Sequence, residues 1–262
     1  MTFVNPGQAY LQNREFMLYY RHFMKLSSRS IAVVFSGFLF FQALVAPVSA
    51  ASLPMSSSWA REIVPRMDPL HTNYQHGVPV LTWRGVSGAA DYISRADCSG
   101  FLLALFSQAY GLTGVDYKSW TGSTRPSAAM IHDYIKKNKR FTTMTTVTDI
   151  IPGDVIAIKY LDGTVGSTGH IALVDGAPQE LVATAPLLPA TKQWSVRIID
   201  STETPHSTGD SRQLTSGSYS GLGTGTMRLY TDLSNRIIGY SWSLSKYSIV
   251  YQRSRDIVVG RY

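Results

Sequence analysis

Apolar residues after position 97 recur at the spacing expected for one buried face of a helix. The positions concerned are Phe101, Leu102, Leu105, Phe106 and Ala109. Asp97 is a suitable N-cap because its carboxylate can accept hydrogen bonds from the first backbone N–H groups of a helix. Gly111 follows the apolar positions and is a common helix terminator. The pattern therefore predicts a helix from Asp97 to Tyr110.

A second helix is predicted from Ser127 to Asn138, after Pro126. Beyond it, short apolar and β-branched runs bounded by turn residues predict a series of strands. The predicted strands are Val155–Tyr160, His170–Asp175, Trp194–Asp200, Met227–Thr231, Arg236–Trp242, Ile249–Gln252 and Ile257–Gly260. Residues 201–226 are rich in Ser, Thr and Gly and are predicted to form a long loop. Helices followed by an antiparallel sheet indicate an α+β domain.

The N-terminal segment has the pattern of an export signal. Lys25 and Arg29 precede an apolar run from Ile31 to Val45, and Pro47-Val48-Ser49-Ala50 resembles a small-residue cleavage site. We expect residues 1–50 to be removed on export, with residues 1–23 an over-extended start. Residues 51–79 are expected to form a flexible lead, and residues 80–262 a single domain with a C-terminal strand extension. The predicted location is periplasmic or extracellular, without a membrane span after cleavage.

The formal charge of +7 does not by itself indicate a nucleic-acid partner. Four of the 24 basic residues lie within residues 1–50, in the predicted export signal. The cluster of basic residues near the end of the second predicted helix consists of Lys136, Lys137, Lys139 and Arg140. Positive charge there complements the helix dipole, which favours a solvated helix end. We therefore expect no nucleic acid among the partners.

The chain has one cysteine, in the stretch Asp97-Cys98-Ser99-Gly100-Phe101. A thiol in the first turn of a helix faces unpaired backbone N–H groups and the positive end of the helix dipole, which favour the thiolate. A single cysteine cannot form an intramolecular disulfide, although exported proteins usually pair their cysteines. The alternative interpretation is a small buried apolar side chain. We predict that Cys98 is a nucleophile with a lowered pKa.

A cysteine nucleophile needs a base, and the base needs a group that orients it. Of the six histidines, His22 lies in the export signal, and His132 is predicted on the polar face of a helix. His71 and His76 have no third ligand at metal spacing, so no metal site or other cofactor is expected. His170 opens a predicted strand and is the candidate base. Its alternative is a structural role.

Pairing of the predicted strands supplies a partner for this base. An antiparallel hairpin with its loop near residues 177–193 places Asp200 directly opposite His170. Cross-strand neighbours have Cβ atoms about 5 Å apart, which is within reach of an orienting carboxylate. The alternative for Asp200 is an ordinary residue at the end of a strand. His206 is the competing third member of the site, or a substrate contact.

These residues resemble the NlpC/P60 family of cysteine peptidases. The resemblance covers roughly residues 80–200 and rests on Asp97-Cys98-Ser99-Gly100-Phe101, Pro152-Gly153-Asp154-Val155 and Gly169-His170-Ile171-Ala172-Leu173-Val174. The stretch Leu81-Thr82-Trp83-Arg84-Gly85 is similar to a degraded form of the family's Tyr-x-Trp-Gly-Gly segment. The resemblance implies a papain-like α+β fold and hydrolysis of amide bonds in bacterial cell-wall peptides. It also implies that Cys98 is the nucleophile and His170 the base.

The chain departs from the family pattern at two places within the motif region. Leu81 stands where the family usually has a tyrosine near the oxyanion hole. No suitable polar side chain lies near Glu180, where the family's third residue is expected, so Asp200 is the geometric substitute. We expect an exported Cys-His-Asp hydrolase that acts on peptidoglycan peptide. The alternatives are a non-catalytic envelope binding module on the same fold and an acyltransferase or transglutaminase-like enzyme.

Overall fold

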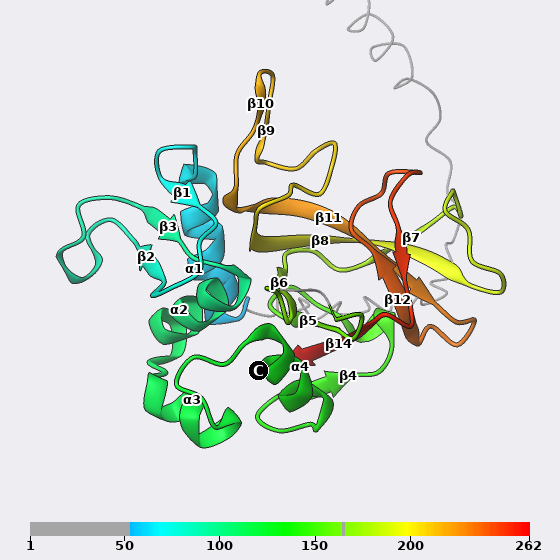
Figure 1. The fold of residues 1–262 in the computed structure, drawn as a ribbon, viewed down its shortest axis with the longest axis horizontal. Coiled ribbons are helices and arrows are strands. Elements are labelled where there is room, and N and C mark those ends of the chain that lie inside the picture. The colour runs from blue at the N-terminus through cyan, green and yellow to red at the C-terminus, as the bar shows by residue number, and fades with distance from the viewer. Residues whose placement is uncertain (1–52, 164–165) are drawn as a thin grey trace, which may run out of the picture. The chain divides into compact units, whose positions relative to one another are not determined.

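The computed structural model describes residues 53–163 and 166–262, so the predicted export signal lies outside the described residues. In this part the chain has a mixed α+β fold with an antiparallel main sheet and a small sheet in which β1 and β3 are parallel (Figure 1). The helices are α1 (Met55–Ile63), α2 (Cys98–Tyr110), α3 (Gly114–Thr121) and α4 (Ala128–Lys136). The strands are β1 (Thr72–Asn73), β2 (Val80–Thr82), β3 (Ile93–Arg95), β4 (Thr142–Met144), β5 (Val155–Tyr160), β6 (Gly169–Val174), β7 (Gln179–Leu181), β8 (Lys192–Thr202), β9 (Gln213–Leu214), β10 (Gly217–Ser218), β11 (Gly221–Thr231), β12 (Ile237–Ser241), β13 (Val250–Tyr251) and β14 (Arg255–Arg261).

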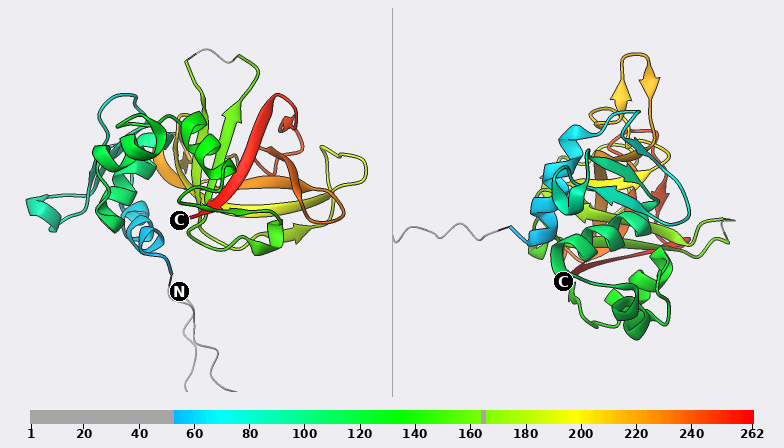
Figure 2. Two further views of the ribbon diagram at one scale, coloured as in Figure 1. Left: turned by 90° about the horizontal axis from the view of Figure 1, so that it is seen from below. Right: turned by 90° about the vertical axis from the view of Figure 1, so that its left-hand side faces the viewer.

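The main sheet of the described residues has the order β13-β12-β11-β8-β6-β5-β14-β4, with β7 also paired to β8. Its pairings are antiparallel, and β8 and β11 pair over eleven positions. A bridge between Thr146 and Arg236 joins the segment after β4 to the start of β12. The two ends of the strand order therefore approach one another, and the sheet curls on itself (Figure 2). The small sheet β1-β3-β2 lies beside α2.

Two clusters of buried side chains lie on opposite faces of the main sheet. Strand side chains alternate between the faces, so Ile156 and Ile158 belong to one cluster and Val155 and Ala157 to the other. The cluster that includes Val155 and Ala157 also contains most of the buried side chains of α1, α2 and α4. The helices thus cover one face of the sheet, while the other face packs against itself within the curl.

The two predicted helices are present. Asp97 caps α2 by accepting a 2.6 Å hydrogen bond from the Gly100 N–H, and Gly111 ends α2 in the left-handed conformation. Helix α4 is slightly shorter than the predicted 127–138 and is capped by Ser127. Local caps and apolar spacing are therefore sufficient to define these elements.

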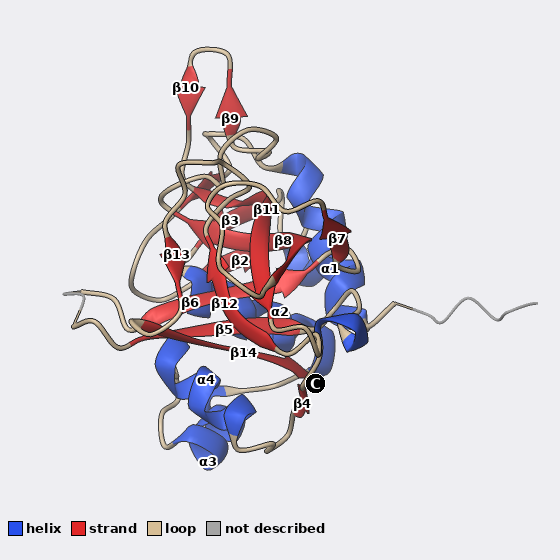
Figure 3. Cartoon of the chain, turned by 90° about the vertical axis from the view of Figure 1, so that its right-hand side faces the viewer, coloured by secondary structure: helices blue, strands red, loops and turns tan. Residues whose placement is uncertain are grey.

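Three segments differ from the predictions. The expected flexible lead contains α1, whose Ala60 and Ile63 are fully buried in the core. Helix α3 was not predicted, although Thr113 and Asp116 form a capping box at its start. The expected loop at 201–226 holds the end of β8, the hairpin β9–β10 and the first half of β11. This hairpin projects away from the main sheet (Figure 3).

No single helix among the described residues is long and apolar enough to cross a membrane. Helices α2 and α3 together pass the criteria of length and composition, with a bend of 117° between them.

Candidate active site

Strands β6 and β8 form a fork that opens at the start of β6. They pair only at residues 173–174 with 198–199, so Asp200 is in register with Ala172 rather than with His170. The predicted direct pairing of Asp200 with His170 was therefore wrong by two residues. An even offset keeps both side chains on the same face of the sheet. His170 Nε2 lies 2.7 Å from Asp200 Oδ2, and the predicted contact between these side chains is confirmed.

His206 approaches the same carboxylate oxygen from the other side. Its Nε2 lies 2.9 Å from Asp200 Oδ2, and its Nδ1 lies 2.6 Å from the backbone oxygen of Trp242. Both ring nitrogens thus face backbone or carboxylate oxygens at hydrogen-bonding distance. Asp200 and His206, considered as alternatives in the sequence, both belong to the cluster. Asp200 is the one that contacts His170.

Arg212 anchors the opposite side of the Asp200 carboxylate. Its guanidinium is fully buried and donates to Asp200 Oδ1 at 2.9 Å and to both carboxylate oxygens of Asp210 at 2.7–2.8 Å. It also donates to the backbone oxygens of Asp200 and Gly221. The buried guanidinium of Arg212 is thus shared between two buried carboxylates, Asp200 and Asp210.

The surroundings of the two catalytic candidates in the fork, Asp200 and His170, lower the pKa of both groups. Burial opposes ionisation of Asp200, but His206 and Arg212 hold its pKa well below the usual value. Burial also lowers the pKa of His170, against the opposing effect of Asp200. Since Nε2 of His170 faces Asp200, Nδ1 is the nitrogen left to act as a base. Among the described residues, this Nδ1 has no hydrogen-bond partner.

Cys98 lies at the start of α2, next to β6. The hydroxyl of Ser201 on β8 donates a 2.6 Å hydrogen bond to the backbone oxygen of Ala96, which ties the segment before α2 to the fork. Backbone N–H groups of Ile171 and Ser99 face the sulfur. Even so, burial, reinforced by the neighbouring Asp97, raises the pKa of the Cys98 thiol to about 12. The predicted lowering of this pKa is therefore wrong for the structure described here, because desolvation outweighs the N–H groups at the helix start.

The structure brings Cys98 and His170 to neighbouring hollows without a hydrogen bond between them among the described residues. Cys98 lines a hollow of about 180 Å³, and His170 lines one of about 420 Å³. The two hollows share Tyr74, His76 and Gly169 on their walls. Cys98 packs in the cluster beneath the helices, whereas His170 is the cross-strand partner of Ile158, which lies in the cluster on the other face of the sheet.

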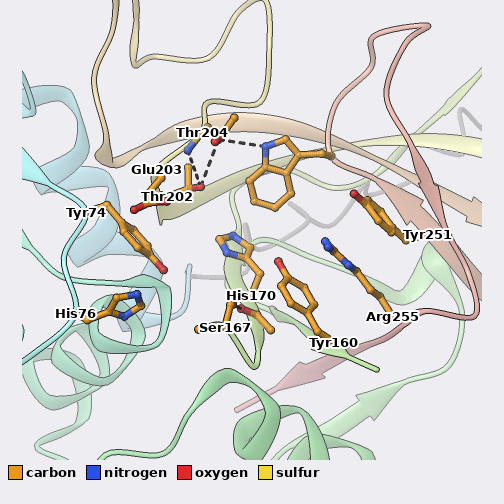
Figure 4. Close-up of a pocket in the computed structure, with 13 residues that line it drawn as sticks. Tyr74, His76, Tyr160, Ser167, His170, Thr202, Glu203, Thr204, Tyr251 and Arg255 are labelled. Atoms are coloured by element: carbon orange, nitrogen blue, oxygen red, sulfur yellow. Dashed lines mark hydrogen bonds between the residues drawn. The ribbon is translucent and has the colours of Figure 1, made fainter. Parts of the chain in front are cut away.

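The larger hollow is shown in Figure 4, where His170 lies at its centre. Trp242 packs over both imidazoles, with ring centroids 4.0 Å from His206 and 4.8 Å from His170. Its indole N–H donates to the backbone oxygen of Thr204 at 3.1 Å, which fixes the ring. Trp242 thereby shields the imidazoles from water on one side and leaves the other side of His170 open to the hollow.

The cluster of His170, Asp200 and His206 also has the residue types of a metal site, and their ligand atoms lie within 4.8 Å of one another. The arrangement does not suit a cation. The guanidinium of Arg212 contacts Asp200, and both histidines already direct hydrogen-bonding nitrogens at its Oδ2. The donor atoms are thus used within the cluster.

Sequence reasoning missed several residues of the hollows. Tyr74 lies in the segment expected to be flexible, and Trp242 and Arg255 lie in the C-terminal extension beyond the family resemblance. Asp210 and Arg212 lie in the expected loop, where the only available signal was its unusual length. Leu81, the position of the family tyrosine, packs against the core beside α2 and lines a different hollow.

Gly169 sets the start of β6 against β5, and we expect its replacement by alanine to be strongly destabilising. A Cβ atom there would lie 1.9 Å from the backbone oxygen of Ile158, at a φ of +156°. The free energy of unfolding of Gly169→Ala should fall by about 3 kcal/mol or more, measured by denaturant titration. Gly176→Ala is the matched control, because its Cβ would meet only the Arg197 Cβ, at an ordinary 3.6 Å. Similar losses in both variants would contradict this close approach.

The comparisons with known proteins give one informative match. No family model matches the chain, and no solved structure matches it. The chain is similar to "Uncharacterized protein R653" of Acanthamoeba polyphaga mimivirus, with 35% identity over 219 residues. The match covers 79% of this chain and 96% of the viral protein. The chain therefore belongs to the same family as this mimivirus protein.

Proposed function

We propose that the protein is a thiol hydrolase with a papain-like NlpC/P60 fold that cleaves an amide bond in a peptide substrate. One observation carries the proposal. The only cysteine begins helix α2, which packs beside β6, and His170, the second residue of β6, has its Nε2 2.7 Å from Asp200 Oδ2. A cysteine, a base and an orienting carboxylate are the three components that nucleophilic amide cleavage requires. The cell-wall peptide rests on the sequence resemblance, and the exported location rests on the signal pattern of residues 25–50.

The proposed reaction begins with a neutral thiol and a neutral imidazole. Because the pKa of Cys98 is raised and that of His170 is lowered, the proton moves from sulfur to Nδ1 of His170 during attack. The sulfur then bonds to the substrate carbonyl carbon, and the C–N bond breaks as His170 returns the proton to the leaving amine. Water, activated by His170, hydrolyses the thioester and releases the acid.

Two hydrogen-bond donors are available for the oxyanion of this reaction. The first is the backbone N–H of Cys98 at the start of α2. The second is the hydroxyl of Tyr74, a residue that lines both hollows. Burial raises the pKa of Tyr74, so its hydroxyl keeps the proton that it would donate. Tyr74, which directly follows β1, would thus take the place of the family tyrosine at the position of Leu81.

The decisive experiment is digestion of purified peptidoglycan, with mass analysis of the released fragments. The protein should release peptides cut at one type of amide bond, and Cys98→Ala should lower the rate by at least about 10³-fold. Ser107→Ala, an exposed position on the same helix, should digest at the normal rate. An added amine should not appear in the products, because its incorporation would identify an acyltransferase. Release of identical fragments by Cys98→Ala would disprove the nucleophile.

A non-catalytic binding module is the second candidate, favoured by the burial of Cys98 and by its missing hydrogen bond to His170. This function predicts that the protein binds peptidoglycan without cutting it. It also predicts that Cys98→Ala binds as well as the unmodified protein. Sedimentation with insoluble peptidoglycan, performed alongside the digestion, separates the two functions.

A further inference from the structure

We propose that Ser201 is a positioning residue that holds the turn carrying Cys98 against the fork of β6 and β8. The inference rests on the proposed function, because it names a further residue of the same site. Ser201 acts through the backbone of the residues before Cys98 and contacts neither the substrate nor the reacting atoms. It directly follows Asp200 in the sequence, so one short segment of β8 holds both halves of the site.

Adjacent residues of β8 face opposite sides of the main sheet. Asp200 contacts His170 on one side. Ser201 faces the other side, because its cross-strand partner Leu222 belongs to the buried cluster beneath the helices, which also contains Cys98. Since the imidazole and the thiol are held from opposite faces, their relative position depends on how firmly the turn before α2 is attached to the end of β8.

The hydroxyl of Ser201 provides this attachment through one short, buried hydrogen bond. It donates to the backbone oxygen of Ala96 at 2.6 Å, and neither residue is more than 1% exposed. The N–H of Ala96 donates to the backbone oxygen of Asn73 at 3.4 Å, which is a longer and weaker contact. A buried carbonyl oxygen that loses a donor is costly, so the bond from Ser201 is the stronger of the two attachments.

The backbone between this bond and the thiol is short and fixed. Ala96 precedes Asp97, the N-cap of α2, and Cys98 is the first residue of the helix. The Asp97 carboxylate accepts from the Gly100 N–H at 2.6 Å, which holds the turn in one conformation. A displacement of Ala96 is therefore passed directly to Cys98 and is not absorbed by a flexible loop.

A second hydroxyl attaches the neighbouring small sheet at the adjacent position. Thr72 of β1 is buried, and its Oγ1 accepts a 2.8 Å hydrogen bond from the N–H of Leu222, the partner of Ser201. Strand β1 pairs with β3, which leads into the turn before α2. The small sheet and the Cys98 turn are thus joined to the paired ends of β8 and β11, and Ser201 is the contact nearer to Cys98.

The test begins with alkylation of Cys98, which is specific because the chain has one cysteine. Ser201→Ala should raise the rate of alkylation by iodoacetamide, followed by mass spectrometry at one pH, about tenfold, because the turn opens more often without this bond. The same variant should lower kcat about 10–100-fold on a soluble peptide that contains the bond cut in peptidoglycan, with KM within about twofold. A thiol displaced by about 1 Å attacks poorly, although the substrate still binds.

Thr143→Val is the matched control. The hydroxyl of Thr143 also donates a 2.6 Å hydrogen bond to a backbone oxygen, that of Ile135, but it joins β4 to α4 at the end of the strand order. Its alkylation rate and kcat should stay within about twofold of the unmodified protein. Ser201→Thr keeps the hydroxyl on a strand, where β-branched residues are favoured, and should restore both values to within about threefold. Thermal unfolding by circular dichroism verifies that each variant is folded at the temperature of measurement.

The outcomes separate this role of Ser201 from the hydrolase itself. An unchanged alkylation rate in folded Ser201→Ala would overturn the role, and so would equal changes in Thr143→Val or a raised KM with unchanged kcat. If the unmodified protein does not cut peptidoglycan, the hydrolase proposal fails, and the alkylation rates still decide whether Ser201 holds Cys98. If the protein cuts peptidoglycan and Ser201→Ala is normal in both alkylation and cutting, the hydrolase proposal stands and the role of Ser201 fails.

Discussion

Replacing Arg212 by methionine is expected to lower the free energy of unfolding by about 3–5 kcal/mol. The side chain of Arg212 is fully buried and pairs with two fully buried carboxylates, Asp200 and Asp210. Methionine fills similar space but leaves both carboxylates without their guanidinium, and a buried charge without a partner is costly. Because whole domains are stable by only about 5–15 kcal/mol, a large share of the stability depends on this one side chain. Denaturant unfolding at neutral pH measures the loss.

The control for this prediction is Arg236→Met. Arg236 also pairs with an aspartate, at 2.7 Å from Asp232, but its side chain is 71% exposed. Exposed pairs contribute less than about 1 kcal/mol, so this variant should unfold almost as the unmodified protein does. If both variants lose the same free energy of unfolding, the buried pairs of Arg212 contribute no more stability than the exposed pair of Arg236.

The pairing of Arg212 with Asp200 also determines how the stability of the fold changes with pH. The pKa of Asp200 is lowered in the folded protein, so its ionised form contributes stability above the unfolded value near 3.8. That contribution is lost as the pH falls through the lower folded value. In Arg212→Met, protonation of Asp200 relieves the unpaired charge. The difference in stability between the variant and the unmodified protein should therefore shrink below about pH 4.

Replacing Asp200 by asparagine is expected to lower kcat/KM for the proposed hydrolysis by about 10³-fold or more. Oδ2 of Asp200 accepts from His170 and His206, while Oδ1 accepts from Arg212. An asparagine must place its NH₂ group against one of these sets of donors. If the NH₂ group faces the histidines, His170 loses the acceptor that fixes its tautomer, and if it faces Arg212 the guanidinium loses its partner.

Asp175→Asn separates this catalytic effect from a loss of stability. Asp175 is also buried and pairs with two arginines, Arg61 and Arg197, but it contacts neither histidine. We expect it to destabilise the fold while leaving kcat/KM of the folded protein within about twofold. Stability is followed by thermal unfolding, and kcat/KM is measured at a temperature where both variants are folded. Equal losses of activity in the two variants would remove Asp200 from the site.

Local sequence signals were sufficient where an element carried its own start, stop and periodicity. Helix α2 has Asp97, Gly111 and an apolar face, and β5 begins and ends at the predicted residues. The contact between His170 and Asp200 was also predictable, because a register error of two residues preserves the face of each side chain. Helix α1 lacked such signals, since two of its buried residues are the serines Ser56 and Ser57.

His132 shows where local reasoning fails. It was predicted to be exposed on the polar face of a helix, but its side chain is buried between Asp133 and Asp256. Asp256 comes from β14, which lies more than a hundred residues further along the chain. The polarity of a helix face could not indicate that a distant strand covers it.

The sequence alone determined the α+β class, the helix that presents Cys98, and the strands that carry His170 and Asp200. Each of these follows from caps, periodicity and alternation, which are properties of neighbouring residues. Only the tertiary structure determines the pairing of Asp200 with Arg212, the stacking of the Arg255 guanidinium on the Tyr160 ring, and the burial of Cys98. The physical reason is that desolvation and ion pairing depend on which distant segments surround a group. Here the curl of the main sheet brings residues from β5, β6, β8, β13 and β14 around one hollow.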